Sequence, residues 1–169
     1  DKVGGTWREN KYPGLSCDTP AHSYTYSFAP NPDWSRYFAP GQEIRSYFES
    51  IMDRYELREN IMFNTEVVSC RFHNARWRVR TMDGGEYKCD VVLAATGVLH
   101  HPLIPEIAGL NDFAGPAMHT ARWDDSLELD GKRIGVIGTG STGVQLVSAL
   151  AARAARLVHL VRTPQWIMP

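Results

Sequence analysis

Hydrophobic side chains recur at helical spacing in one stretch of the first half of the chain. Between residues 41 and 55 the apolar positions follow an i, i+3, i+4 pattern, which indicates an amphipathic helix with one buried face. The pattern is formed by Ile44, Tyr47, Phe48, Ile51 and Met52. We therefore predict a helix over residues 41–55 that packs through this stripe.

A different periodicity follows in the middle of the chain. Over residues 76–82, apolar side chains alternate with arginines, which is the two-residue period of a half-buried strand. Asp83-Gly84-Gly85 then supplies the residues that a tight turn needs. Further strand candidates are residues 61–63, 66–72 and 86–88. Together these segments predict a small antiparallel β insertion.

Continuous apolar runs predict strands that are covered on both faces. One such run covers residues 89–95. Another, residues 132–137, is followed by a helical pattern over 141–152 and a strand over 157–161, which together predict one βαβ unit. Residues 98–131, between the two runs, are irregular and rich in Pro and Gly. This composition predicts a boundary between domains.

Residues 1–40 contain many aromatic, proline and glycine residues and few periodic patterns. Aromatic side chains need a surface to pack on, so we expect a long ordered loop region rather than a solvated linker. Long ordered loops usually carry function. The alternative is a loop that only fills its own core.

The junction between residues 132–137 and the following helix reads Gly138-Thr139-Gly140-Ser141-Thr142-Gly143, a G-x-G-x-x-G pattern. The pattern alone is weak, but here it follows an apolar strand and opens a helix, as a dinucleotide site requires. The first glycine permits the tight turn, the second lets a pyrophosphate approach the backbone, and the third allows close packing of helix and strand. The helix N-terminus then attracts the phosphates. The alternative is a glycine turn of purely structural origin.

The end of the next strand indicates which coenzyme is preferred. An NAD site usually has an acidic residue about 20 positions after the glycines, whereas this chain has Arg162-Thr163 and no Asp or Glu after Ser141. A guanidinium forms a bidentate pair with a 2′-phosphate, which a carboxylate would repel. We therefore predict NADP(H), the alternative for Arg162 being a solvated charge at a strand end.

Bulk composition narrows the possible functions. The 169-residue chain has a net charge of −1, which offers no electrostatic basis for binding nucleic acid or an anionic membrane. The longest apolar run, residues 91–99, is too short to span a bilayer. Neither end resembles a natural terminus, because residue 1 is Asp and the chain is already in a glycine-rich loop by Gly4. We therefore expect an internal fragment of a longer protein.

The three cysteines, Cys17, Cys70 and Cys89, are widely separated. They match neither a disulfide framework nor a metal site, and we expect reduced thiols in a cytoplasmic protein. His100-His101 has no carboxylate or thiol ligand at a suitable spacing, so we predict no metal site.

Residues 113–124 resemble the F-x-G-x-x-x-H-x-x-x-W-[P/D] signature of type I Baeyer–Villiger monooxygenases. The matching positions are Phe113, Gly115, His119, Trp123 and Asp124. Related flavin monooxygenases that oxygenate nitrogen or sulfur typically have Tyr or Phe in place of Trp123. Three further segments resemble family motifs, namely residues 4–18 (G-G-T-W…Y-P-G-x-x-x-D), 95–97 (A-T-G) and 162–164 (R-T-P).

The resemblance covers the whole chain and implies an α/β fold built from two incomplete dinucleotide-binding, Rossmann-like domains. Residues 1–100 would belong to the FAD domain, 101–130 to a linker, and 131–169 to the NADPH domain. The family's first FAD glycine motif and its active-site arginine have no counterpart within the chain. By itself, the chain would therefore bind FAD poorly and would not turn over.

The resemblance also implies contacts for single residues. The implied FAD contacts are Gly5, Thr6, Trp7, Asp18, Tyr24, Val67 and Gly97. The implied NADP contacts are Ser16, Cys17, Asp18, Gly138, Thr139, Gly140, Ser141, Thr142, Gly143, Gln145, Arg162 and Thr163. Asp18 would lie near the flavin and the nicotinamide, and His119 would act indirectly from the linker. Ordinary packing remains the alternative for Trp7 and Tyr24, a structural histidine for His119 and a loop cap for Asp18.

The implied activity uses NADPH to reduce FAD, which then reacts with O2 to form a C4a-peroxide that converts a ketone into an ester or lactone. The alternatives are an N- or S-oxygenating flavin monooxygenase, or a non-catalytic nucleotide-binding module. A disulfide reductase would need a redox cysteine pair, which the chain lacks. The sequence names neither the ketone nor the oligomeric state.

Overall fold

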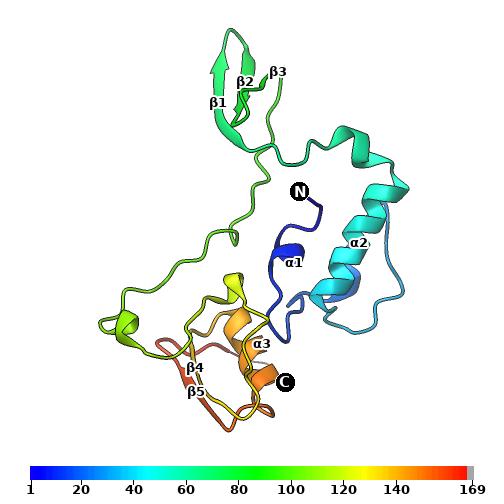
Figure 1. The fold of residues 1–169 in the computed structure, drawn as a ribbon. Helices are drawn as coiled ribbons and strands as arrows, with labels where there is room; N and C mark the ends of the chain where they lie inside the picture. The colour runs from blue at the N-terminus through cyan, green and yellow to red at the C-terminus, as the bar shows by residue number, and fades with distance from the viewer. Residues whose placement is uncertain (167–169) are drawn as a thin grey trace.

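A computed structural model describes residues 1–166 of the chain. The α-helices are α1 (Thr6–Glu9), α2 (Gly41–Arg54) and α3 (Ser141–Leu150). The strands are β1 (Val67–His73), β2 (Arg76–Thr81), β3 (Glu86–Cys89), β4 (Arg133–Ile137) and β5 (Arg156–Leu160). The sheet of β1–β3 stands at one end of the molecule, and α3 with β4 and β5 lies at the other (Figure 1). The α/β character predicted from the sequence is confirmed.

Helix α2 forms where the apolar stripe predicts it and ends one residue earlier than expected. Ile44, Tyr47, Ile51 and Met52 are buried, and burying a side chain of this size stabilises the fold by roughly 1.5–3 kcal/mol. Glu56 then takes a left-handed conformation with φ 52°, which ends the helical path.

The aromatic-rich loop region is ordered because it packs on α2. We call their joint core the first core; it consists of Cys17, Ala21, Ala29, Trp34, Ala39, Ile44, Tyr47 and Ile51. The Tyr47 hydroxyl accepts from the Tyr26 N–H and donates to the Ala29 carbonyl, both at 2.8 Å. The loop thus fills a core, which was the alternative considered from the sequence. Its other contacts place it beside α3.

The predicted antiparallel insertion is present as the sheet β1-β2-β3. The Gly85 N–H donates to the Asp83 carboxylate across the turn. Residues 61–63, predicted as a strand, are not one, since the chain leaves a short 3₁₀ helix, Leu57–Asn60, and enters a turn with Asn64 at φ 53°. Only residues 61 and 62 lie between the 3₁₀ helix and this turn, which is too short for a strand.

The predicted buried strand over residues 89–95 is also wrong in its greater part. Cys89 ends β3, whereas residues 91–97 form no paired strand and Leu93 is 88% exposed. A strand exists only where a neighbour satisfies its backbone N–H and C=O groups. Among residues 1–166 no strand lies beside this apolar segment.

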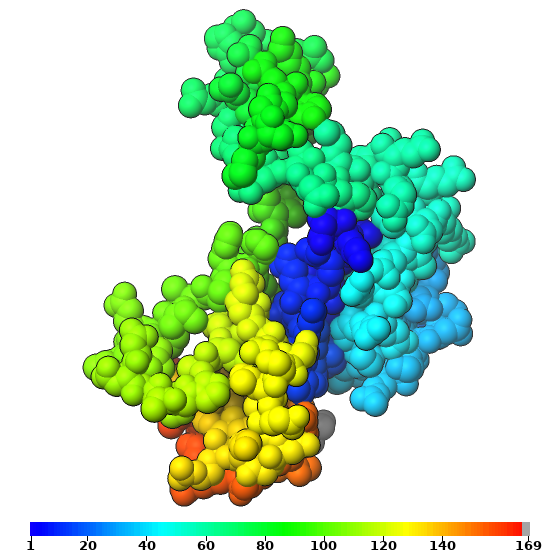
Figure 2. Space-filling model, viewed as in Figure 1, coloured from blue at the N-terminus to red at the C-terminus, as the bar shows by residue number. Residues whose placement is uncertain are grey.

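The βαβ unit forms as predicted. Strands β4 and β5 are parallel, with Ile134 opposite Leu157, and α3 connects them through the glycine segment. We call the buried cluster around this unit the second core; it consists of Tyr12, Val136, Leu146 and Leu150. Tyr12 comes from the N-terminal loop, so that loop belongs to both cores. Figure 2 shows the dark-blue N-terminal residues between α2 and the yellow residues near 120–130.

None of the helices described in residues 1–166 has the length and apolar character needed to cross a membrane.

Candidate cofactor-binding site

The glycine segment lies at a strand-to-helix junction, immediately after β4. Gly138 has φ +107°, a conformation that favours glycine. A Cβ on Gly143 would lie 2.3 Å from the Gly138 carbonyl oxygen, so only glycine allows α3 to approach the strand this closely. A Cβ on Gly140 would meet no atom within 4 Å. The space beside Gly140 is therefore open to a ligand.

The N-terminus of α3 offers donors for that ligand. No side chain caps the helix at Gly140, and the first N–H groups of a helix have no intrahelical partner. These groups and the positive end of the helix dipole favour an anion. The observed geometry therefore fits a dinucleotide pyrophosphate, which would lie against Gly138 and Gly140.

Arg162 and Thr163 follow β5 beside the glycine segment. The Thr139 hydroxyl donates to the Thr163 carbonyl at 2.9 Å, which ties the end of β5 to the turn. Arg162 is exposed and forms no ion pair within the part of the chain that is described. A guanidinium at this position is free to meet a 2′-phosphate.

His159 also belongs to this site, although sequence reasoning missed it. It lies in β5, and its Nε2 is 2.7 Å from the Gly138 carbonyl oxygen. Because a carbonyl only accepts, Nε2 carries the proton and donates. His159 therefore supports the turn at Gly138. No motif in the sequence marks this role, which follows from the pairing that sets His159 opposite Val136.

Two of the three implied NADP contacts in the N-terminal loop, Ser16 and Asp18, lie against α3. The Ser141 hydroxyl donates to the Asp18 carboxylate at 2.6 Å. Both backbone groups of Ser16 bond to the Gln145 side chain, whereas Cys17 is buried in the first core. The structure thus brings together residues that stand more than 120 positions apart in the sequence.

Four predicted FAD contacts also group together. Gly5 begins α1, which contains Thr6 and Trp7, and the Trp7 Nε1 donates to the Tyr24 hydroxyl at 3.2 Å. The two rings meet edge to face at 5.8 Å. Val67, in contrast, is 52% exposed at the start of β1, away from this group. Gly97 lies in the extended segment after residue 91 and is also exposed.

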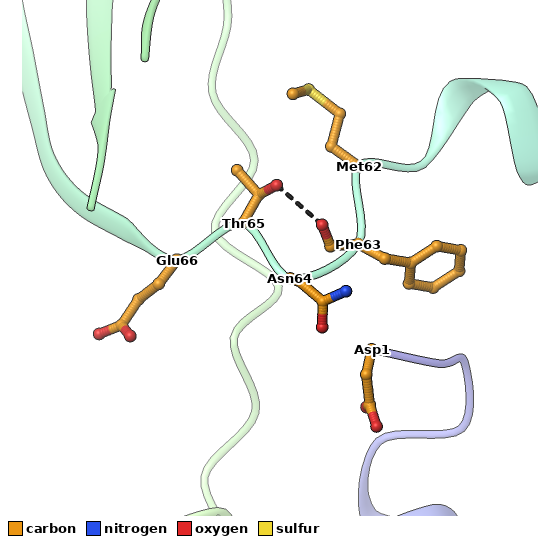
Figure 3. Close-up of a pocket in the computed structure, with 6 residues that line it drawn as sticks. All are labelled: Asp1, Met62, Phe63, Asn64, Thr65 and Glu66. Carbon is orange, nitrogen blue, oxygen red and sulfur yellow. Dashed lines mark hydrogen bonds between the residues drawn. The ribbon is translucent and has the colours of Figure 1, made fainter. Parts of the chain in front are cut away.

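Val67 adjoins an open depression. The depression is lined by Asp1, Met62, Phe63, Asn64, Thr65 and Glu66. Figure 3 shows Asp1 and Asn64 on facing segments, with the Thr65 hydroxyl bonded to the Phe63 carbonyl. This surface has polar groups from two chain segments beside Val67, one of the implied FAD contacts.

The linker signature has a clear local structure. The His119 Nδ1 accepts from the Ala121 N–H at 3.1 Å and so caps the 3₁₀ turn Thr120–Arg122. Trp123 packs on the second core. Asp124 accepts from the Ser126 hydroxyl and N–H, and these hydrogen bonds lower the pKa of its carboxyl group.

A contact that the sequence did not predict joins the linker region to α1. The His100 Nδ1 lies 2.8 Å from the Glu9 carboxylate, and the Arg122 guanidinium reaches the His100 carbonyl at 3.5 Å. The hydrogen bond from His100 lowers the pKa of Glu9 despite its partial burial, and Arg8 and Arg122 add to the effect. No group of three or more potential metal ligands gathers anywhere in residues 1–166.

Comparison with known proteins places this geometry in a family. A family model described as flavin-binding monooxygenase-like matches residues 8–169. The chain belongs to this family. Within it, the chain is 55% identical over its whole length to an uncharacterized monooxygenase of Mycobacterium tuberculosis, covering 34% of that protein. It is 44% identical to a Baeyer–Villiger monooxygenase of Streptomyces coelicolor, covering 32% of that protein.

Solved structures of the family agree with the fold. A cyclohexanone monooxygenase from Rhodococcus sp. Phi1, bound to NADP+, matches all of the chain with a TM-score of 0.86 and 41% identity. The chain covers 33% of that structure. It thus spans about a third of the length of the relatives it matches, and the resemblance to Baeyer–Villiger monooxygenases found in the sequence is confirmed.

Proposed function

We propose that this chain is part of an FAD-dependent, NADPH-using monooxygenase that inserts one oxygen atom of O2 into a small ketone to give an ester or lactone. The observation that carries the proposal is the open glycine turn at the N-terminus of α3, to which the chain just after Arg162 is tied by the bond from Thr139 to Thr163, with the Arg162 side chain exposed. The likeness to Baeyer–Villiger and cyclohexanone monooxygenases supports it. The signature residues Trp123 and Asp124 favour this class over N- or S-oxygenation.

The residues of the βαβ unit hold the coenzyme. Gly138 and Gly140 would hold the pyrophosphate, and the N–H groups of the first turn of α3 with the hydroxyls of Ser141 and Thr142 would donate to it. Arg162 pairs with the 2′-phosphate, and Thr163 is fixed beside it by Thr139. The two charged groups of the coenzyme, its pyrophosphate and its 2′-phosphate, would thus each meet hydrogen-bond donors of the chain.

The residues of the N-terminal loop form one wall of the flavin site. Gly5, Thr6 and Trp7 approach the flavin end, and Tyr24 supports Trp7. Asp18 lies between this wall and α3. When bound, FAD supplies the redox chemistry, accepting hydride from NADPH and activating O2. The protein's part is to orient the two cofactors and exclude water.

The division into an FAD part (residues 1–100), a linker (101–130) and an NADPH part (131–169) belongs to the same proposal. It is supported by the two separate cores and by the linker turn that His119 caps. Loop residues 12–18 cross this division, since Tyr12 packs in the second core.

The product formed by the intact, FAD-loaded protein tests this function. With NADPH and O2, a cyclic ketone should be converted to the lactone, whereas a tertiary amine offered in parallel should yield little N-oxide. The measurement is product analysis by mass spectrometry. Formation of N-oxide without lactone would assign the protein to the N-oxygenating class instead.

A further inference from the structure

The short extended segment Leu15–Cys17 has partners on one side from the start of α2. The Cys17 N–H donates to the Ala39 carbonyl at 3.0 Å, and the Gly41 N–H donates to the Leu15 carbonyl at 2.9 Å. In an extended chain, successive residues direct their backbone groups to opposite sides. The N–H and C=O of Ser16 therefore point away from α2, toward α3.

The side chain of Gln145 supplies the partner on that second side. Its Nε2 donates to the Ser16 carbonyl at 2.8 Å, and its Oε1 accepts from the Ser16 N–H at 3.3 Å. A glutamine amide presents one acceptor and a donor pair side by side, as a peptide group does. Gln145 thus takes the place of a neighbouring strand.

The surroundings of Gln145 hold this contact in place. The Tyr12 hydroxyl lies 3.0 Å from the same Oε1, and Tyr12 is buried in the second core. Gly14 has φ +82°, and a Cβ there would lie 2.8 Å from the Gln145 carbonyl oxygen. The loop therefore lies directly against the backbone of α3, and both ends of the Gln145 amide are occupied by protein partners.

The contact joins two parts of the site. Cys17 belongs to the first core, which also supports Trp7 and Tyr24. Gln145 lies two residues after Gly143, about one turn along α3 from Ser141, and Asp18, two residues after Ser16, bonds to Ser141. Ser16 is therefore a point at which the loop that carries Cys17 is held against α3, the helix that begins at the phosphate-binding turn.

We propose that Gln145 is a positioning residue that sets the flavin wall against the phosphate-binding turn by pairing with the backbone of Ser16. This inference rests on the proposed function, because its consequence is the rate of hydride transfer between two bound cofactors. A small displacement of reacting groups lowers such a rate strongly while leaving the binding contacts intact. Because the Gln145 amide is bonded to Ser16 and Tyr12, this role runs through Ser16, in place of the direct NADP contact that the resemblance implies for Gln145.

The test compares Gln145→Met, which keeps the side-chain length but removes the hydrogen bonds to Ser16 and Tyr12, with Ser148→Ala on the same helix. Ser148 is exposed and bonds only to the Val144 carbonyl of its own helix. Both variants are made in the intact, FAD-loaded protein. Stopped-flow measurements at varied NADPH give the limiting rate of flavin reduction and the dissociation constant, and hydrogen–deuterium exchange gives the protection of the Ser16 amide.

Gln145→Met should slow the limiting reduction rate by about tenfold or more, with less than about a threefold change in NADPH affinity, and the Ser16 amide should exchange faster. Ser148→Ala should match the wild type in all three. An unchanged reduction rate in Gln145→Met, or an unchanged exchange rate at Ser16, would overturn the inference. Failure of the proposed function would instead appear in the wild type, as a flavin that NADPH does not reduce, and the exchange measurement would still test the contact.

Discussion

Asp18 lies at the positive end of α3, where its carboxylate accepts from the Ser141 hydroxyl. A negative charge at a helix N-terminus is stabilised by about 0.3–1 kcal/mol. A coenzyme pyrophosphate would approach the same N–H groups and the same hydroxyl, so Ser141 has two competing acceptors when the coenzyme binds. Asp18 is thereby placed to respond to the binding of the coenzyme, and its location near the nicotinamide stays a prediction.

Glu9 is a second residue whose charge matters, because it joins α1 to the linker region through His100. Its pKa is lowered from 4.5 in the folded protein. A carboxyl group with a lowered folded pKa adds stability above its unfolded pKa and loses it as the pH falls through the folded value. The contribution of Glu9 is therefore complete at neutral pH and disappears in acid.

The variant Glu9→Gln should lower the stability of the intact protein by about 0.5 kcal/mol at pH 7, as is usual for a partly exposed pair. The difference from the wild type should shrink as the pH falls below 4.5. Thermal melting across pH 4–7 measures this. Glu128→Gln, at an exposed glutamate of the linker, is the control, and a difference for Glu9→Gln that does not depend on pH would contradict the account.

At the level of elements, the sequence predicts those parts whose neighbours are close in the chain. The stripe of α2, the alternation of β2 and the β4–α3–β5 unit all form, because their pattern and their packing partner come from the same or adjacent segments. Residues 91–95 fail as a strand, since strand formation depends on a neighbour and the pattern does not say whether one is present.

The same distinction between local and distant contacts decides how much of the candidate site the sequence predicts. The turn at Gly138 is fixed by local geometry, and its spacing reveals it. The pairing of Gln145 with Ser16 and the support of Gly138 by His159 arise from contacts across the fold, and no periodicity or spacing in the sequence indicates them. The roles of single residues toward the cofactors remain predictions.

Two glycines of the turn, Gly143 and Gly140, differ in whether they tolerate a Cβ. Gly143→Ala places a Cβ against the Gly138 carbonyl, so we expect it to lower stability by roughly 1–3 kcal/mol and to weaken NADPH binding. Gly140→Ala meets no protein atom within 4 Å, and its φ of −63° suits alanine. It should weaken NADPH binding without changing the melting temperature.

Thermal melting and NADPH titration of both glycine variants separate these effects. If Gly140→Ala bound NADPH as tightly as the wild type, the open space beside Gly140 would not be the site of the pyrophosphate.

The whole molecule is arranged around the N-terminal loop, which contributes Cys17 to the first core and Tyr12 to the second. In the proposed function, hydride transfer would require a coenzyme on α3 and a flavin beside α1 to meet, so the rate of flavin reduction would report on both halves at once. We propose that coenzyme preference enters this rate through Arg162, the charged residue that follows the end of β5.

Anaerobic flavin reduction in the intact protein, by NADPH and by NADH, is therefore the most direct test. The wild type should be reduced far more efficiently by NADPH. Arg162→Ala should lose about 1.5–3 kcal/mol of binding toward NADPH, the value of a hydrogen bond to a charged group, and change little toward NADH. An equal loss of reduction efficiency with NADPH and with NADH in Arg162→Ala would contradict the assignment of the 2′-phosphate to this guanidinium.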